Sequence, residues 1–133
     1  MRLAGYAARF GTPDAARDTI LPGAFARTLA ARRDQLVGPL PLYWQHRPEQ
    51  RIGWVELAQE DTRGLRVIAC VDNALGRAAQ DLQARSVNGL SFGYRANRFH
   101  HTVSGRILEQ IDLFEVSLVT HPLQHGGRVH FIC

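Results

Sequence analysis

The sequence contains no lysine: all 16 of its basic residues are arginine, against 12 acidic residues and a formal net charge of +4. A basic balance can indicate an acidic partner such as nucleic acid. Surfaces that bind phosphate groups ordinarily use both lysine and arginine, however. Because the lysine-free composition comes with abundant alanine, it indicates a GC-rich genome, and we do not expect binding of nucleic acid.

Long apolar runs and regularly spaced cysteines are also missing. Nowhere do 18 apolar residues follow one another, and the first ten residues carry Arg9 and no apolar stretch of signal-peptide length. We therefore expect neither a membrane span nor a visible export signal. Cys70 and Cys133 form no CxxC or Cys/His spacing, which predicts no disulfide framework, metal site or cofactor and is typical of a reducing compartment.

What is present is enough apolar sequence for one core: 45% of 133 residues are hydrophobic, which predicts a single domain over residues 1–133. Period-two alternation predicts strands over residues 2–9, 40–46, 51–59, 64–72, 87–103 and 105–121, the last two joined by a turn near Ser104-Gly105. Helical spacing predicts one helix over Pro22–Arg32 and a second within 72–86. The second would be N-capped by Asp72 or Asn73, with one face formed by Leu75, Ala78, Ala79 and Leu82. The predicted fold class is mainly β with two helices (α+β).

The stretch "VNGLSFGY" presents a polar face in an apolar strand. Leu90, Phe92 and Tyr94 alternate with Ser91 and Gly93, so one face carries a hydroxyl beside bare backbone. A bare face of this kind leaves room for a substrate backbone. We therefore interpret Ser91 as a candidate nucleophile and Gly93 as a point of substrate approach, near the backbone amides that would stabilise an oxyanion.

Two further polar residues stand in apolar surroundings. Glu115 lies in "IDLFEVSLV", where Ile111 and Leu113 are predicted to share its side of the strand, and a buried carboxylate needs a partner. His46 closes the alternating series Leu40, Leu42, Trp44. A histidine oriented by a carboxylate accepts the proton of a serine hydroxyl, so Ser91, His46 and Glu115 form a candidate catalytic set.

Each member of this set has a simpler structural explanation. A strand serine is usually a tolerated small residue, a single histidine is usually a satisfied polar group, and a strand glutamate usually pairs with an arginine. Spacing does not establish that the three residues meet, because a triad is defined by its geometry and not by sequence order.

Four segments together resemble a known family: "GYAARFGTPDAARDTILPGAFARTL", "PLYWQHRPEQRIGWV", "VNGLSFGYRA" and "LFEVSLVTHP". In order and wording they are similar to the caudovirus (HK97-type) prohead serine proteases, including those of phage-like gene transfer agents. The resemblance covers about Leu3 to Val129. It implies the fold of the herpesvirus assembly proteases, a closed β-barrel surrounded by short helices.

The resemblance also implies an activity and a setting. Members are serine endopeptidases that cleave the scaffold, or the scaffold-like N-terminal segment of the major capsid protein, and usually themselves. They act inside the immature capsid, which places this chain in the cytoplasm of a bacterial host. The implied partners are the major capsid protein and its scaffold segment, further copies of the chain in a homo-oligomer, and the portal.

Position by position, the resemblance assigns the motif histidine to His46, the motif serine to Ser91 and the motif acid to Glu115. The alternative third member is His121, because the herpesvirus relatives use a second histidine. This chain departs from the common pattern at Arg47, where members commonly have aspartate, and at His121, where they have an apolar residue. We expect a positive charge at Arg47 to lower the pKa of His46 unless Glu49 or substrate compensates.

Two other functions compete with proteolysis. One is a catalytically impaired assembly factor that keeps the protease fold and binds capsid or portal proteins, which the departure at Arg47 favours. The other is nucleic-acid binding through "YRANRFHH", where aromatic residues alternate with arginine. A hairpin tip with solvated arginines explains that segment as well.

Overall fold

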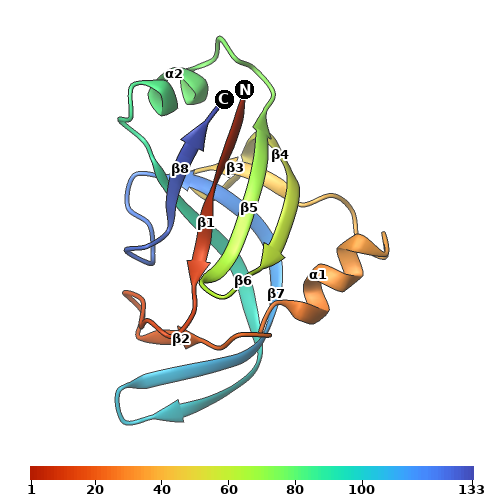
Figure 1. The fold of residues 1–133 in the computed structure, drawn as a ribbon, viewed down its shortest axis with the longest axis vertical. Helices are drawn as coiled ribbons and strands as arrows, with labels where there is room; N and C mark the ends of the chain where they lie inside the picture. The colour runs from red at the N-terminus through yellow and green to blue at the C-terminus, as the bar shows by residue number, and fades with distance from the viewer.

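The computed structural model describes all residues 1–133, and most of the chain forms a closed β-barrel (Figure 1). Seven strands close in the order β7-β3-β4-β5-β1-β8-β6, with β6 pairing back onto β7, and β2 adds to the outer part of β7. The strands are β1 (Arg2–Arg9), β2 (Asp18–Ile20), β3 (Pro41–Trp44), β4 (Arg47–Glu60), β5 (Gly64–Val71), β6 (Gly89–Thr102), β7 (Gly105–Val119) and β8 (Arg128–Ile132); the helices are α1 (Ala26–Arg33) and α2 (Arg77–Gln83). The predicted mainly β barrel with short helices is confirmed.

The barrel interior is filled by apolar side chains that alternate along the strands. On β5, Leu65, Val67, Ala69 and Val71 are buried, while the residues between them are only partly covered. They belong to one cluster of 23 buried residues drawn from strands and helices together. The two-residue period of the sequence is thus the period of burial.

Two strands, β2 and β8, were not predicted from the sequence. β8 pairs with β1 and contacts β6 through the Gly89–Arg128 pair, so it closes the barrel. β2 has three residues and runs parallel to β7. Figure 1 shows the two chain ends side by side, where the amide of Arg2 donates to the carbonyl of Cys133 at 2.9 Å. Both strands are too short for alternation to identify them.

Both helices start later than predicted. α1 begins at Ala26 and not at Pro22, because the preceding residues form turns, and fully buried Phe25 precedes the first helical residue. α2 begins at Arg77 with Gly76 as its N-cap. The predicted caps do not serve it: the side chain of Asn73 accepts the amide of Leu75 at 3.1 Å, which forms a turn instead.

Leu75 corrects the predicted helix face as well. Its side chain is 85% exposed in the turn before α2, whereas Ala79 and Leu82 are fully buried. The helix is therefore shorter than the apolar spacing indicated, and its core face consists of these two residues and partly buried Ala78.

A bulge at Phe114 changes which side chains of β7 share a face. Gly93 on β6 pairs with Glu115, and the next residue, Tyr94, pairs with Leu113, so Phe114 is an extra residue without a partner. Leu113 before the bulge and Val116 after it both belong to the core cluster. Glu115 therefore lies on the opposite face from Leu113, and the prediction that they share a side is wrong.

The outer halves of β6 and β7 form a hairpin that projects from the barrel, with the predicted turn at Ser104 and Gly105 (Figure 1). Its arginines pair with carboxylates of β7 and β2. Arg95 contacts Asp112 at 3.0 Å, and Arg98 contacts Glu109 at 3.7 Å. Because these charges are paired within the protein, the alternation in "YRANRFHH" is a feature of the hairpin and gives little support to nucleic-acid binding.

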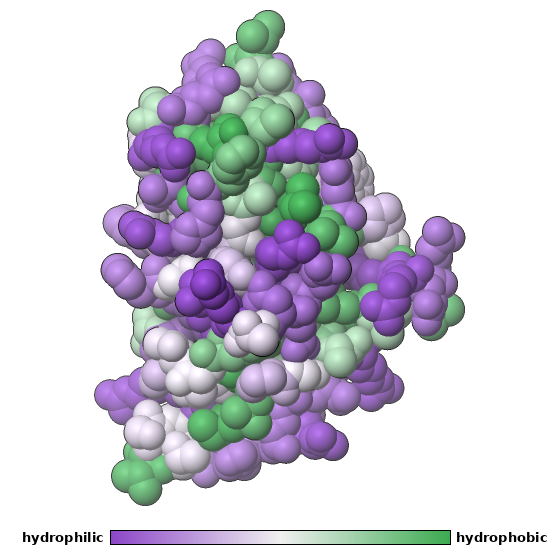
Figure 2. Space-filling model, viewed as in Figure 1, coloured by the Kyte–Doolittle hydropathy of each residue, from purple (hydrophilic) through white to green (hydrophobic).

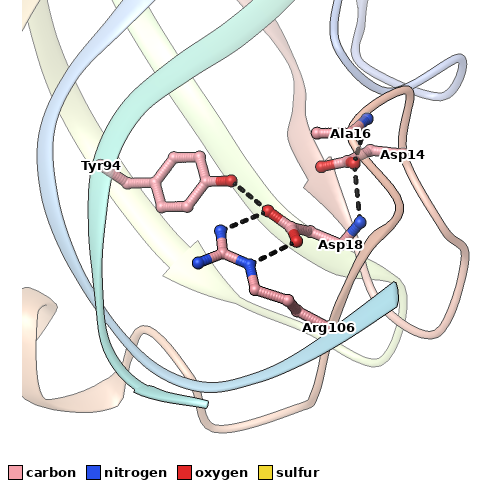
Figure 3. A network of polar contacts seen from close by, with 5 residues as sticks. All are labelled: Asp14, Ala16, Asp18, Tyr94 and Arg106. Atoms are coloured by element: carbon pink, nitrogen blue, oxygen red, sulfur yellow. Dashed lines mark hydrogen bonds and ion pairs between the residues drawn. The ribbon is translucent and has the colours of Figure 1, made fainter. Parts of the chain in front are cut away.

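A buried carboxylate fastens the base of this hairpin (Figure 3). Asp18 is 2% exposed and accepts two hydrogen bonds of 2.8 Å from Arg106 and one of 2.8 Å from the hydroxyl of Tyr94. The bonds from Arg106 hold the pKa of Asp18 below its ordinary value. Nearby Asp14 accepts the amides of Ala16 and Asp18, and burial raises its pKa. β2 is thereby tied to β6 and β7.

The surface carries no continuous apolar area on the face drawn in Figure 2, where green patches are separated by polar side chains. None of the helices has the length and apolar character required to cross a bilayer.

Candidate active site

The turn between β3 and β4 places His46. The predicted strand through His46 ends earlier, at Trp44, and Trp44 pairs directly with Arg47. The two residues between them, Gln45 and His46, have φ values of +53° and +62°. Such two-residue connections match the twist of a hairpin, but they usually contain Asn or Gly, because left-handed backbone costs other residues about 1–2 kcal/mol each.

β7 holds this turn in its unfavourable backbone conformation. The amide of Gln45 donates to the carbonyl of Leu118 at 2.9 Å, and the Gln45 side chain accepts the amide of Thr120 at 3.2 Å. The amide of His46 donates to the hydroxyl of Ser117 at 3.2 Å. Two hydrogen bonds with β7 and one with the residue that follows it thus fix the histidine above β7.

The imidazole of His46 meets the carboxylate of Glu115. Nδ1 of His46 lies 2.6 Å from Oε1 of Glu115, and the other carboxylate oxygen accepts the hydroxyl of Ser117 at 2.6 Å. The side chain of Glu115 is 10% exposed, against 43% for that of His46. The buried carboxylate therefore has two partners, and its contact with Nδ1 leaves Nε2 of the ring free to accept a proton.

The pKa of His46 is raised above its ordinary value, chiefly by the hydrogen bond to Glu115. Burial of the ring opposes this shift but does not outweigh it. The expected lowering of this pKa by Arg47 does not occur, because the carboxylate dominates, and the exposed side chain of Arg47 makes no ion pair or hydrogen bond within the protein. The departure at Arg47 leaves the histidine basic.

Ser91 lies on β6, the strand that pairs with β7. It is 3% exposed, and it stands directly opposite Ser117 in the pairing of β6 with β7. Directly opposed residues of an antiparallel pair point to the same face, so Ser91 shares the face that carries Ser117 and Glu115. Its hydroxyl makes no hydrogen bond within the protein, and none joins it to His46. Catalytic hydrogen bonds are often long before substrate binds.

Gly93 leaves room for the side chain of Glu115. A Cβ atom at this position would lie 2.9 Å from Cγ of Glu115 and 3.0 Å from its Cδ, inside van der Waals contact. The side chain of Glu115 thus occupies the space above Gly93, which sequence analysis assigned to a substrate backbone. The bare face of "LSFGY" accommodates the acid of the site.

His121 makes no ion pair with Glu115. It follows β7 in a bend, is exposed and makes no hydrogen bond with His46. Of the two candidates for the third position, Glu115 is the one in contact with the histidine.

Ser117 is the site residue that sequence reasoning missed. It is fully buried, accepts the amide of His46 and donates to Glu115, so it links the turn to the acid. One signal was present: a second hydroxyl two residues after Glu115, on the same side of an apolar strand.

Comparison with known proteins identifies a family. The model of a family described as caudovirus prohead serine protease matches residues 1–133. The prohead protease of Enterobacteria phage HK97 is 35% identical over 134 residues, which cover 94% of this chain and 57% of that protein. The chain therefore spans little more than half the length of this relative.

Solved structures share the fold. The capsid assembly protease of bacteriophage T4 superposes with a TM-score of 0.70 at 13% identity, covering 89% of this chain and 80% of the other. The varicella-zoster virus protease gives 0.66 at 18% identity, covering 99% and 64%. A Kaposi's sarcoma herpesvirus (KSHV) protease solved with a hexapeptide phosphonate inhibitor gives 0.59 at 17% identity, covering 96% and 62%. At these identities the likeness concerns the barrel alone.

Proposed function

Because the chain belongs to the caudovirus prohead serine protease family, we propose that it is a serine endopeptidase of capsid maturation. Its substrates are the scaffold, or the scaffold-like N-terminal segment of the major capsid protein, and the chain itself. It acts within the immature capsid in the cytoplasm of a bacterial host. The observation that carries the proposal is the 2.6 Å contact between Nδ1 of His46 and Glu115, on the sheet face that also bears Ser91.

The proposed reaction follows the chemistry of an activated serine. Nε2 of His46 takes the proton of the Ser91 hydroxyl while Oγ attacks the scissile carbonyl carbon. The imidazolium is stabilised by Glu115 and returns the proton to the leaving amine, which leaves an acyl-enzyme. Water then attacks the ester carbonyl, gives its proton to His46 and releases the new carboxylate, and Ser91 recovers its proton.

Co-expression with the major capsid protein of the same genetic element tests this proposal. Ser91→Ala and His46→Ala should each abolish processing, as read by gel electrophoresis and intact mass. The matched control is Ser104→Ala, at the exposed turn of the β6–β7 hairpin, which should process normally. Normal processing by either site variant would refute the proposed mechanism.

The competing function, an assembly factor without catalysis, is separated by covalent labelling. A serine-reactive phosphonate should modify the wild-type chain at Ser91 and leave the Ser91→Ala variant unmodified. The raised pKa of His46 supports the catalytic function over the impaired one. An unlabelled wild-type chain that still associates with capsid or portal protein would favour the assembly factor.

A further inference from the structure

A groove of about 840 Å³ opens beside the His46 turn. Its walls come from the flanks of the candidate site and from α2, and they include Gln45, Arg47, Arg77, Asp81, Val87 and Thr120. A second groove of about 320 Å³ continues it along α2 and shares Arg77 with it. The two grooves are adjacent, and their volumes are large enough for several residues of a peptide.

The groove adjoins the candidate site through residues at or beside the ends of β4, β6 and β7. Gln45 and Arg47 are the chain neighbours of His46, and Thr120 is the first residue after β7, three residues beyond Ser117. Val87 precedes the nucleophile candidate Ser91 by four residues. The groove thus begins next to the turn that carries His46, and we take it as the path of a peptide whose carbonyl carbon lies at Ser91.

Arginine charge in the groove is only partly compensated. Arg51 pairs with Asp72 at 2.8 Å, and Arg77 lies 3.6 Å from Asp81 in an exposed contact between helix neighbours. Arg47 has no carboxylate partner. Glu49, the nearest carboxylate in the sequence, neither contacts Arg47 nor lines the groove.

The reach of Arg47 sets which part of a substrate it can contact. Its Cα lies about 3.8 Å from that of His46, and an extended chain advances about 3.3–3.6 Å per residue. The guanidinium therefore reaches side chains within about two residues of the scissile bond. A planar guanidinium without an internal partner matches a carboxylate, with which it forms two parallel hydrogen bonds.

We propose that this groove binds the substrate chain and that Arg47 selects an acidic side chain, Asp or Glu, within two residues of the scissile bond. The proposal rests on the proposed proteolysis and names the substrate class for that site. It predicts that reversing the charge at position 47 reverses the preference for acidic substrate side chains. An Arg47 that only contacts solvent would show no such reversal.

A cleavage profile tests the preference. The wild-type chain is incubated with a mixture of peptides of randomised sequence, and the products are sequenced by mass spectrometry. Asp and Glu should be enriched about two- to fivefold at one position within two residues of the cleaved bond, as for an exposed ion pair. Arg47→Glu should replace that enrichment by Lys and Arg. Arg33→Glu, an exposed residue of α1 outside the groove, should keep the wild-type profile.

A binding measurement separates this inference from the proposed function. Fluorescent peptides that differ only by Glu, Gln or Lys at the selected position, or at each central position in turn if nothing is cleaved, are titrated into the Ser91→Ala chain. The Glu peptide should bind about two- to fivefold more tightly than the Gln peptide, and Arg47→Glu should invert the order. Charge-selective binding without cleavage would remove the proposed function but keep the groove. Cleavage or binding without charge preference, or with a preference unchanged in Arg47→Glu, would overturn the inference.

Discussion

Replacement of Ser117 by alanine tests whether the network under His46 stabilises the fold. The hydroxyl is fully buried and makes two hydrogen bonds, at 2.6 Å to Glu115 and at 3.2 Å from the amide of His46. Loss of a hydrogen bond to a charged group costs about 1.5–3 kcal/mol, while the exposed His46 turn lets water replace part of the second bond. We expect Ser117→Ala to lower the free energy of unfolding by about 2–3 kcal/mol.

The matched control is the residue directly opposite, Ser91. It is equally small and nearly as buried, but its hydroxyl makes no hydrogen bond within the protein. Ser91→Ala should therefore change the free energy of unfolding by no more than about 0.5 kcal/mol. Urea unfolding followed by circular dichroism measures both variants, provided that the dependence on urea concentration is unchanged. Equal midpoints for the two variants would refute the reasoning.

Three further variants test the charges of the site and of the hairpin. Glu115→Gln should return the pKa of His46 toward its ordinary value near 6.5 in an NMR titration. The raised pKa stabilises the folded chain at low pH, and this stabilisation is lost as the pH rises through the pKa of folded His46. The variant should therefore lose stability mainly at pH values below that pKa. Gly93→Ala should displace Glu115 and lower the same pKa, whereas Gly38→Ala, with nothing within 4 Å of the added Cβ, should not. Asp18→Asn should destabilise the chain by about 3 kcal/mol at neutral pH. Because the pKa of Asp18 is lowered in the folded chain, the difference in stability between variant and wild type should shrink as the pH falls through that pKa. A difference that stays constant with pH would contradict the ion pair.

The regular part of the fold was predictable because burial on one face imposes a period of two. β5 and most of β1 follow that alternation, and the turn at Gly105 between β6 and β7 carries its own glycine signal. The short strands β2 and β8 were not predictable, because three to five residues carry too little pattern. Their positions depend on pairing with β7 and β1.

Irregular backbone is where sequence patterns failed. Phe114 is a bulge, and a single unpaired residue exchanges the faces of every residue that follows it. Strict alternation across the bulge therefore placed Glu115 with Leu113. The left-handed pair Gln45–His46 lacks the Asn or Gly that announces such a turn, because hydrogen bonds from β7 hold it instead.

By itself, the sequence determined that the chain forms a mainly β fold, that Ser91, His46 and Glu115 are polar residues in apolar segments, and that Glu115 requires a partner. Those conclusions follow from local periodicity and from the free-energy cost of burying a charge. Only the tertiary structure decided which residues meet. It joined His46 to Glu115 across 69 positions, gave the space above Gly93 to that carboxylate, and revealed Ser117 between them, since such contacts depend on strand register and on a bulge that no local pattern encodes.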